Sequence, residues 1–244
     1  MTQILLLFTA VLLASCNTAP NIVKKDHVSE MTVYGTHSFT FDIHLENIGN
    51  SEKISGLVTS LIYDGRNFDE YIDYREKSFI DSVTNTGNLP VTDADGNEFS
   101  YQHELIEKYS ITFHNDLYMI YEYDSYSTGN RAAHGDKSLK YFIIDLSQEE
   151  LLGLDDLINQ VPDNLLRWVF QTNHSINYFL RDDIWPPDTI NFNSGAVELL
   201  WNTYTLAPYN EGIIKLAVPD GIADQYLTNR GRILRNATLV TASR

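Results

Sequence analysis

The chain has 244 residues, of which 43% are hydrophobic, so a sizeable core is available and the composition argues against global disorder. Its 33 acidic and 17 basic residues give a net charge of −16, which repels nucleic acid and anionic lipid headgroups and attracts cationic partners. The same acidity also serves solubility alone, and both interpretations stay open at this stage.

The first sixteen residues have the pattern of an export signal. An apolar run from Ile4 to Leu13 is too short to span a bilayer and ends in Ala14, Ser15 and Cys16. This ending resembles the lipobox of bacterial lipoproteins. The resemblance implies removal of residues 1–15 and lipidation of Cys16, with the protein anchored in the cell envelope. In a Gram-negative cell that means the outer membrane or the periplasmic face.

Cys16 is the single cysteine of the chain. Once it is lipidated, the folded part holds no thiol. Disulfides, cysteine nucleophiles and thiolate metal sites are then excluded.

The N-terminal part of the mature chain predicts a tether, a strand and two helices. Residues 16–32 are polar with little periodicity and are expected to form a flexible lipidated tether. Residues 37–46 alternate apolar and polar side chains, which predicts a half-buried strand. Apolar positions at helical spacing predict one helix over 51–62, capped by Asn50 or Ser51, and a second over 68–83 with a solvated acidic face.

The middle of the chain predicts strands joined by turns. Residues 84–97 are rich in Asn, Gly, Pro and Asp; the stretch 93–97 lacks the glycine and glutamate positions of a calcium loop, so a turn is preferred. Strands are expected at 98–104, 109–113 and 117–126.

Residues 139–146 carry apolar side chains on both faces. Leu139, Tyr141 and Ile143 point one way, and Phe142, Ile144 and Leu146 point the other. Such a strand is covered on both sides, so we expect it in the middle of the sheet. The glycine-bracketed segment before it is expected to be a recognition loop.

The C-terminal part predicts short alternating elements. We expect helical turns at 147–150 and 154–157, a longer helix over 163–180, strands at 196–204 and 212–218, a short helix at 219–226, and a basic tail at 229–244 that adds a strand or stays loose. The whole pattern predicts an α+β fold of two linked halves, in which antiparallel sheets are packed by a few helices.

Several motifs occur in an order that resembles a known family. Residues 126–135 resemble its Tyr-x-Thr-Gly-Gly-Ala-His-Gly turn, residues 142–146 and 154–157 its next strand and helix start, and residues 206–219 its Ala-Pro-Tyr segment and last strand. This is the extracytoplasmic domain shared by RsiV-type anti-sigma factors and the non-catalytic part of PdaC-type deacetylases, largely described as a domain of unknown function.

The resemblance covers residues 33–228, with a PdaC-like half at 33–126 and an RsiV-like half at 127–228. The turn departs from the family form, since Asn130, Arg131 and Ala132 lengthen it.

The resemblance implies a non-catalytic binding module, because the anti-sigma members bind lysozyme outside the cell. The expected partner is a cationic, lysozyme-like envelope hydrolase or peptidoglycan. No nucleic acid, metal or cofactor is expected. The alternatives are a carbohydrate-active enzyme of the cell wall, an accessory subunit of a deacetylase, or a lipoprotein that holds another envelope protein.

The candidate binding residues lie in the recognition loop and near the C-terminal strands. They are Tyr126, Gly129, Asn130, Arg131, His134, Gly135, Trp201, Tyr204 and Tyr209. A role for His134 in pinning the loop, in partner contact or in catalysis stays open, and the aromatic residues serve core packing equally well. No catalytic motif occurs, and His44, Asp145 and Asp156 are better explained by surface pairing or by capping.

Overall fold

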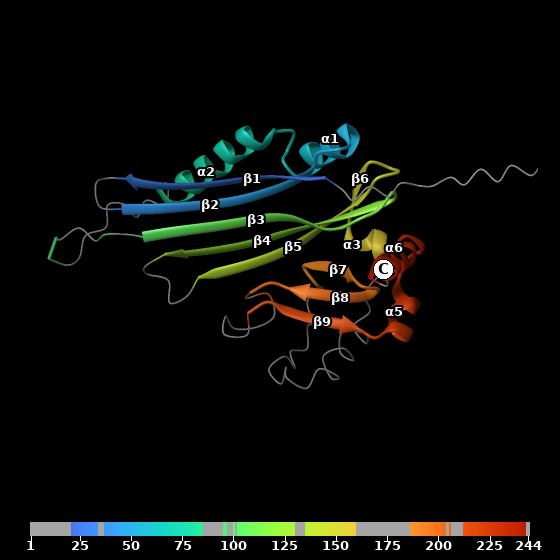
Figure 1. Cartoon of the computed structure of the whole chain (residues 1–244). Coiled ribbons are helices and arrows are strands. Elements are labelled where there is room, and N and C mark those ends of the chain that lie inside the picture. The colour runs from blue at the N-terminus through green and yellow to red at the C-terminus, as the bar shows by residue number, and fades with distance from the viewer. Residues whose placement is uncertain are drawn as a thin grey trace, which may run out of the picture.

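The computed structural model describes residues 21–33, 37–84, 95–96, 100, 102–129, 135–159, 186–203, 205 and 212–242. Over these ranges the chain forms a six-stranded sheet of order β1-β2-β3-β4-β5-β6 and a three-stranded sheet of order β7-β8-β9 (Figure 1). The predicted α+β class with two linked halves is confirmed. The predicted helix at 163–180 and most of the 84–97 loop lie outside the described residues.

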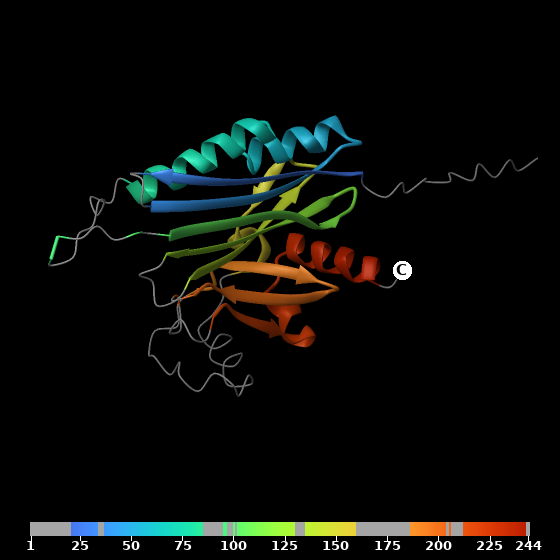
Figure 2. The same cartoon turned by 60° about the vertical axis from the view of Figure 1, so that its left-hand side comes forward.

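The larger sheet carries two helices on one face (Figures 1 and 2). Its elements are β1 (Ile22–Val33), β2 (His37–Ile48), α1 (Glu52–Leu61), α2 (Phe68–Thr84), β3 (Gln102–His114), β4 (Tyr118–Gly129), β5 (Asp136–Asp145) and β6 (Glu150–Leu152). All neighbours pair antiparallel except β2 and β3, so the expectation of purely antiparallel sheets is wrong for this pair. A parallel pair needs a crossover connection, which α1 and α2 lie within.

The smaller sheet packs with three short or amphipathic helices. Its elements are β7 (Thr189–Asn193), β8 (Ala196–Trp201) and β9 (Ile214–Val218), with α3 (Leu154–Leu157), α5 (Asp220–Tyr226) and α6 (Asn229–Ala242) beside them. Both predicted strands and the short helix at 219–226 are confirmed within a few residues. Strand β7 was not predicted, since Thr189 and the two asparagines interrupt its apolar pattern.

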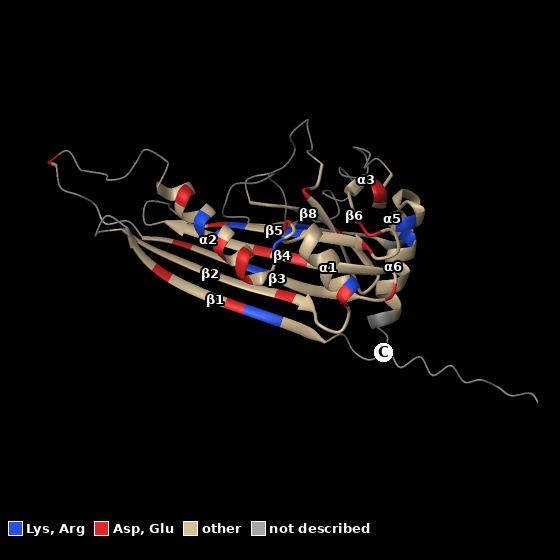
Figure 3. Ribbon diagram, turned by 90° about the horizontal axis from the view of Figure 1, so that it is seen from above, with Lys and Arg blue, Asp and Glu red and all other residues tan. Residues whose placement is uncertain are grey.

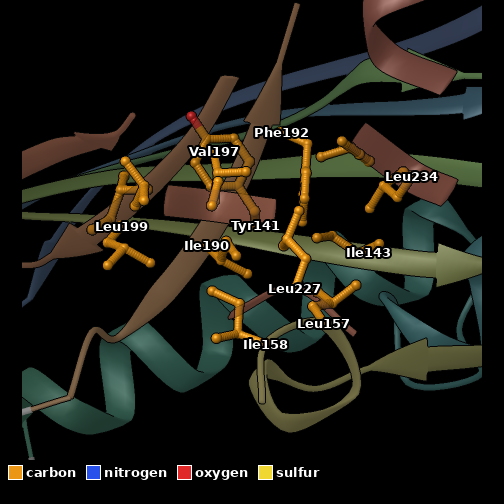
Figure 4. Close-up of a cluster of buried hydrophobic side chains, with 14 of the residues drawn as sticks. Tyr141, Ile143, Leu157, Ile158, Ile190, Phe192, Val197, Leu199, Leu227 and Leu234 are labelled. Atoms are coloured by element: carbon orange, nitrogen blue, oxygen red, sulfur yellow. The ribbon is translucent and has the colours of Figure 1, made fainter. Parts of the chain in front are cut away.

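Two hydrophobic cores lie on opposite faces of the larger sheet. The helix-side core joins β2–β5 to α1 and α2, and includes Phe39, Phe41, Ile43, Leu45, Val58, Tyr63, Tyr71, Phe79, Tyr121 and Ile144. The small-sheet core joins β4–β6 to the smaller sheet and its helices. It includes Tyr141, Ile143, Leu157, Ile158, Ile190, Phe192, Val197, Leu199, Leu227 and Leu234 (Figure 4).

Strand β5 contributes side chains to both cores. Tyr141 and Ile143 enter the small-sheet core, whereas Ile144 enters the helix-side core, so the prediction that both faces are covered is confirmed. The expected central position is wrong, because only the three-residue β6 follows β5 in the sheet. The smaller sheet covers the face of β5 that lies opposite α1 and α2, so this strand is covered on both faces although it lies near the edge of the larger sheet.

The outer edge of β5 is closed by side chains as well as by β6. The Leu139 N–H donates to Asn202 Oδ1 at 2.7 Å, and the Tyr141 N–H donates to Thr189 Oγ1 at 3.2 Å. Thr203 Oγ1 donates to the Lys137 carbonyl at 2.9 Å. A buried backbone group without a partner costs free energy, so these bonds join the two sheets where ladder pairing has stopped.

A bulge in β3 lets this strand serve both cores. The register with β4 shifts between Ile111 and Phe113. As a result Ile111 packs against the helix-side core and Phe113 against the small-sheet core, although simple alternation places both on one face. The two strands predicted at 98–104 and 109–113 are one continuous strand.

The expected flexible tether is wrong for most of its length. Ile22 to Val33 pair antiparallel with β2 over the whole of β1. The positions that face α2 are His27, Ser29 and Met31, which give no apolar alternation. Ser29 donates to Glu76 of α2, so polar contacts and backbone pairing hold this edge strand.

The basic tail is also corrected, because it forms α6. Gly231, Leu234 and Thr238 are its buried positions at helical spacing, and only one of them is large and apolar. Arg230 pairs with Glu150 at 2.7 Å, and Arg235 Nε donates to the Gly195 carbonyl at 2.8 Å. The arginines therefore bind neighbours within the fold.

Other boundaries also shift. The helical turn expected at 147–150 is a turn that leads into β6, whereas the helical turn at 154–157 is confirmed as α3. The division expected between residues 126 and 127 falls inside β4.

Removal of the Asn202 side chain tests the junction at β5. Asn202→Ala leaves the Leu139 N–H without its acceptor, and we expect the free energy of unfolding to fall by about 1–3 kcal/mol. The control is Asn193→Ala on the exposed end of β7, with an expected change within about 0.5 kcal/mol. Urea unfolding measures both, and equal losses contradict the role of this bond.

Two glycine substitutions test how α6 packs. A Cβ at Gly231 meets the Leu157 carbonyl oxygen at 2.2 Å, whereas a Cβ at Gly221 in α5 meets nothing within 4 Å. Helix propensity favours alanine at both by up to about 1 kcal/mol. We expect Gly231→Ala to destabilise by roughly 1–3 kcal/mol and Gly221→Ala to be neutral or stabilising. Thermal unfolding measures both; stabilisation by Gly231→Ala contradicts the close packing.

Candidate functional site

The face of the larger sheet opposite α1 and α2 carries half-exposed and exposed polar side chains along β1–β4. Alternation explains it: Phe39, Phe41 and Ile43 of β2 enter the helix-side core, so the residues between them point the other way. The strand registers align these positions, which we call the open face. It consists of Lys24, Asp26, Val28, Glu30 and Thr32; Ser38, Thr40, Asp42, His44 and Glu46; Gln102, Glu104, Ile106 and Lys108; and Glu122, Asp124, Tyr126 and Thr128.

Carboxylates outnumber lysines on the open face. Its acids are Asp26, Glu30, Asp42, Glu46, Glu104, Glu122 and Asp124, and its lysines are Lys24 and Lys108. Figure 3 shows acidic residues along β1–β4. Seven acids against two lysines give the open face a net charge of −5, out of −16 for the whole chain, on a surface to which strands give a fixed shape.

Most of these carboxylates have partners. His44 Nδ1 lies 2.8 Å from Asp26 Oδ1, and its Nε2 lies 3.2 Å from Asp42 Oδ1. Lys24 Nζ lies 2.6 Å from Glu46 Oε1. The surface pairing predicted for His44 is confirmed, and these contacts tie β1 to β2.

A hollow of about 780 Å³ lies at one end of the open face. It is lined from β1 to β4 by Glu30, Met31, Thr32, Ser38, Phe39, Thr40, Gln102, His103, Glu104, Thr128 and Gly129. Two carboxylates, four hydroxyls and one amide make most of this lining polar. The hollow falls within the size range of small-ligand sites.

His103 is one of the lining residues, and its ring lies on the helix side of the sheet, beside its register partner Phe39. Its ring stacks on Phe39, with centroids 5.6 Å apart and planes 10° from parallel. A Cβ at Gly129 stands 2.8 Å from His103 Nδ1, so glycine leaves the room that this ring needs. Burial lowers the pKa of His103 below its ordinary value, and the neighbouring His37 lowers it further. The imidazole is therefore neutral at pH 7.

The predicted recognition loop begins at this hollow. Gly129 lines the hollow, and Tyr126 lies on the adjacent part of the open face. A Cβ at Gly135 meets the Tyr126 ring at 2.3–2.5 Å, so the ring rests on the backbone at Gly135 and fixes the two ends of the loop together. Asn130, Arg131 and His134, as well as Tyr204 and Tyr209, lie outside the described residues.

Trp201 does not lie on a binding surface. Its side chain is fully buried, with 0% exposure, in the small-sheet core. Core packing, one of the two interpretations open for Trp201, is the one that the structure supports. Its place as a candidate binding residue is corrected accordingly.

Asp145 and Asp156 bind backbone N–H groups at a turn and at a helix N-terminus. Asp145 Oδ1 accepts from the Ser147 N–H at 2.9 Å and from the Gln148 N–H at 3.0 Å. Although burial alone raises the pKa of Asp145, these bonds and the Ser147 hydroxyl lower it overall. Asp156 Oδ2 accepts from the Gly153 N–H at 2.8 Å, so the turn capping predicted for Asp145 and the helix N-terminal position predicted for Asp156 are both confirmed.

A buried ion pair holds α2 to the sheet. Glu107 is fully buried on the helix side; Arg75 Nε donates to its Oε2 at 2.9 Å, and the Tyr123 hydroxyl donates to Oε1 at 2.6 Å. Breaking such a pair leaves an uncompensated buried charge. The pair lies among buried tyrosines and away from the hollow, so its role is structural.

The described ranges hold neither a cluster of metal-ligating side chains nor a helix that could span a membrane. No group of three or more histidine and carboxylate side chains there is arranged to hold a metal ion. No helix among the described residues is both long and apolar enough to cross a bilayer.

The residues of the hollow were not predicted from the sequence. Glu30 belonged to the expected tether, and Glu104 stood at the end of an expected short strand. The polar positions alternate with buried ones along 38–46, and this alternation is the signal that identifies the open face on β2. The hollow itself depends on the registers of four strands, which the sequence does not specify.

No family model matches the chain, and no curated protein matches it in sequence. Among solved structures, the chain is similar to a DUF3298 family member from Bacteroides fragilis, with a TM-score of 0.68, 12% identity, and coverage of 90% of this chain and 97% of that one. It is also similar to a DUF3298 family protein from Pseudomonas aeruginosa, with a TM-score of 0.54, 17% identity, and coverage of 85% and 95%. At these identities the similarity shows a shared fold.

The lowered pKa of His103 predicts a pH dependence of stability. The folded state favours the neutral ring, so this contribution is complete above the unfolded pKa, about 6.5, and is lost as pH falls through the folded pKa. We expect the free energy of unfolding to decrease from about pH 7 to pH 5, and His103→Gln to flatten part of that decrease. Urea unfolding across this range measures it.

His114 provides a second variant for the same measurement. Burial lowers the pKa of His114, with Asp116 opposing the shift. A double variant with His114→Gln is expected to flatten the pH profile further. An unchanged profile in both variants contradicts the assigned ionisation states.

Proposed function

We propose that this chain is a lipid-anchored module of the cell envelope that binds a cationic partner through its open face. The main support for this proposal is the acidic open face, whose side chains are held by four paired strands. Opposite charges across an interface raise the association rate and select the partner. The lipobox ending at Cys16 supports the anchor, and the similarity of fold to the DUF3298 structures is compatible with a domain without a known activity.

The finer proposal is that the partner is a lysozyme-like hydrolase. A basic enzyme complements the carboxylates of the open face, whereas peptidoglycan offers fewer positive groups to them. The family resemblance of residues 126–135 supports the same partner class, and Tyr126 of that motif lies on the open face itself. A non-catalytic role is favoured because the Asp145 carboxylate is committed to a turn.

Binding to a basic muramidase tests this function. Residues 17–244 are expected to bind at about 50 mM salt, where the screening length is roughly 14 Å, with an association rate that falls steeply as salt is raised. Surface plasmon resonance measures both rates, with an acidic protein of similar size as the negative control. Absence of binding to every basic muramidase tried at low salt contradicts the hydrolase proposal.

Matched charge reversals locate the interface. Asp26→Lys changes the open face, and Asp73→Lys makes the same change in charge on α2, at an exposed site on the opposite side of the sheet. We expect the first variant to slow association by about tenfold and the second to change it less than about threefold. Equal effects place the interface elsewhere.

A further inference from the structure

We propose that the hollow at the end of the open face anchors a lysine or arginine side chain of the cationic partner, held between Glu30 and Glu104. This inference rests on the function proposed above and names the point of contact. It assigns the hollow a ligand chemistry that the open face as a whole does not specify.

The strand registers place the two carboxylates on either side of a hydroxyl. Glu30 pairs with Thr40, Thr40 pairs with Glu104, and Glu104 pairs with Thr128, so these four residues form one row across β1–β4. Neighbouring strands lie about 4.8 Å apart, which separates the Cα atoms of Glu30 and Glu104 by roughly 9–10 Å. A cationic group above Thr40 is then within reach of both carboxylates.

These two carboxylates differ from the others on the open face. Asp26 and Asp42 contact His44, Glu46 contacts Lys24, and Asp124 has Lys137 Nζ at 3.8 Å. Among the described residues, neither Glu30 nor Glu104 has an ion-pair partner or a side-chain hydrogen bond. The fold neutralises much of the acidity of the open face and leaves these two charges for a ligand.

The rest of the lining suits a donor-only cation. The hydroxyls of Thr32, Ser38, Thr40 and Thr128 and the Gln102 amide all offer acceptor oxygens. Lysine and arginine side chains carry several N–H donors and no acceptor, so they match this lining. Among the lining residues that the structure describes, none is a lysine or an arginine.

The size of the hollow indicates more than a single side chain. A volume of about 780 Å³ accommodates the side chain together with the loop that presents it. Gly129, where the expected recognition loop begins, is one of the lining residues. A protruding basic loop of a folded partner therefore fits the site better than a flat surface does.

Two double variants of equal charge change test the site. Glu30→Gln/Glu104→Gln neutralises the hollow, and Asp73→Asn/Asp81→Asn neutralises two exposed carboxylates on α2. Binding of a basic muramidase and of a tetra-arginine peptide is measured by titration calorimetry at about 50 mM salt. We expect the first variant to weaken both by at least about tenfold and the second by less than about twofold. Urea unfolding confirms that both variants are folded.

The outcomes separate this inference from the function proposed above. If the muramidase binds the wild type and both double variants equally well, or loses affinity equally in both, the anchor is wrong and the binding function stands. If the muramidase does not bind but tetra-arginine binds in a Glu30- and Glu104-dependent way, the hydrolase proposal is wrong and the chemistry of the hollow is upheld. If neither probe binds the wild type, both are overturned.

Discussion

The structure depends on the hydrogen bonds that strand β5 makes at its outer edge and on the packing of its side chains on both faces. Its edge N–H groups at Leu139 and Tyr141 donate to the side chains of Asn202, which follows β8, and of Thr189 in β7. Its side chains divide between the two cores: Ile143 lies in the small-sheet core and Ile144 lies in the helix-side core. Because a buried edge without partners is costly, these few bonds fix where the smaller sheet lies against the larger one.

This junction also determines which surface is available for binding. The smaller sheet covers the larger one beside β5, and the helices α1 and α2 cover the opposite face (Figures 1 and 2). The uncovered part lies over β1–β3 and the adjoining half of β4. Its polar side chains are fixed by paired strands rather than by a loop, which gives a charged surface a defined shape before a partner arrives.

Much of the fold could be predicted because it has local causes. Ser51 caps α1 through its hydroxyl at 3.3 Å from the Ile54 nitrogen, and the apolar stripes of α1 and α2 occur at helical spacing. The two-sided pattern of 139–146 correctly indicated cover on both faces. These signals depend on neighbours within one turn or one strand.

The features that escaped prediction depend on distant partners. Strand β1 is polar and is held by β2 and by Glu76 of α2, so its own residues give no strand signal. Helix α6 has few buried apolar positions, and Gly231 is placed by its contact with α3. The hollow needs four strands in register, which place Glu30 and Glu104 on either side of Thr40 although the chain separates them widely. Trp201 shows the converse: an aromatic side chain that suits a binding surface and a core equally well was placed in the core by tertiary packing.

The central claim is that a cationic partner docks on the open face with its anchor in the hollow. Carbodiimide footprinting of carboxyl groups, read by mass spectrometry with and without a basic muramidase, tests it most directly. We expect Glu30 and Glu104 to become protected when the partner binds, whereas Asp73 and Asp81 on α2 stay as reactive as before. Protection of the α2 carboxylates with unchanged reactivity at Glu30 and Glu104 contradicts it.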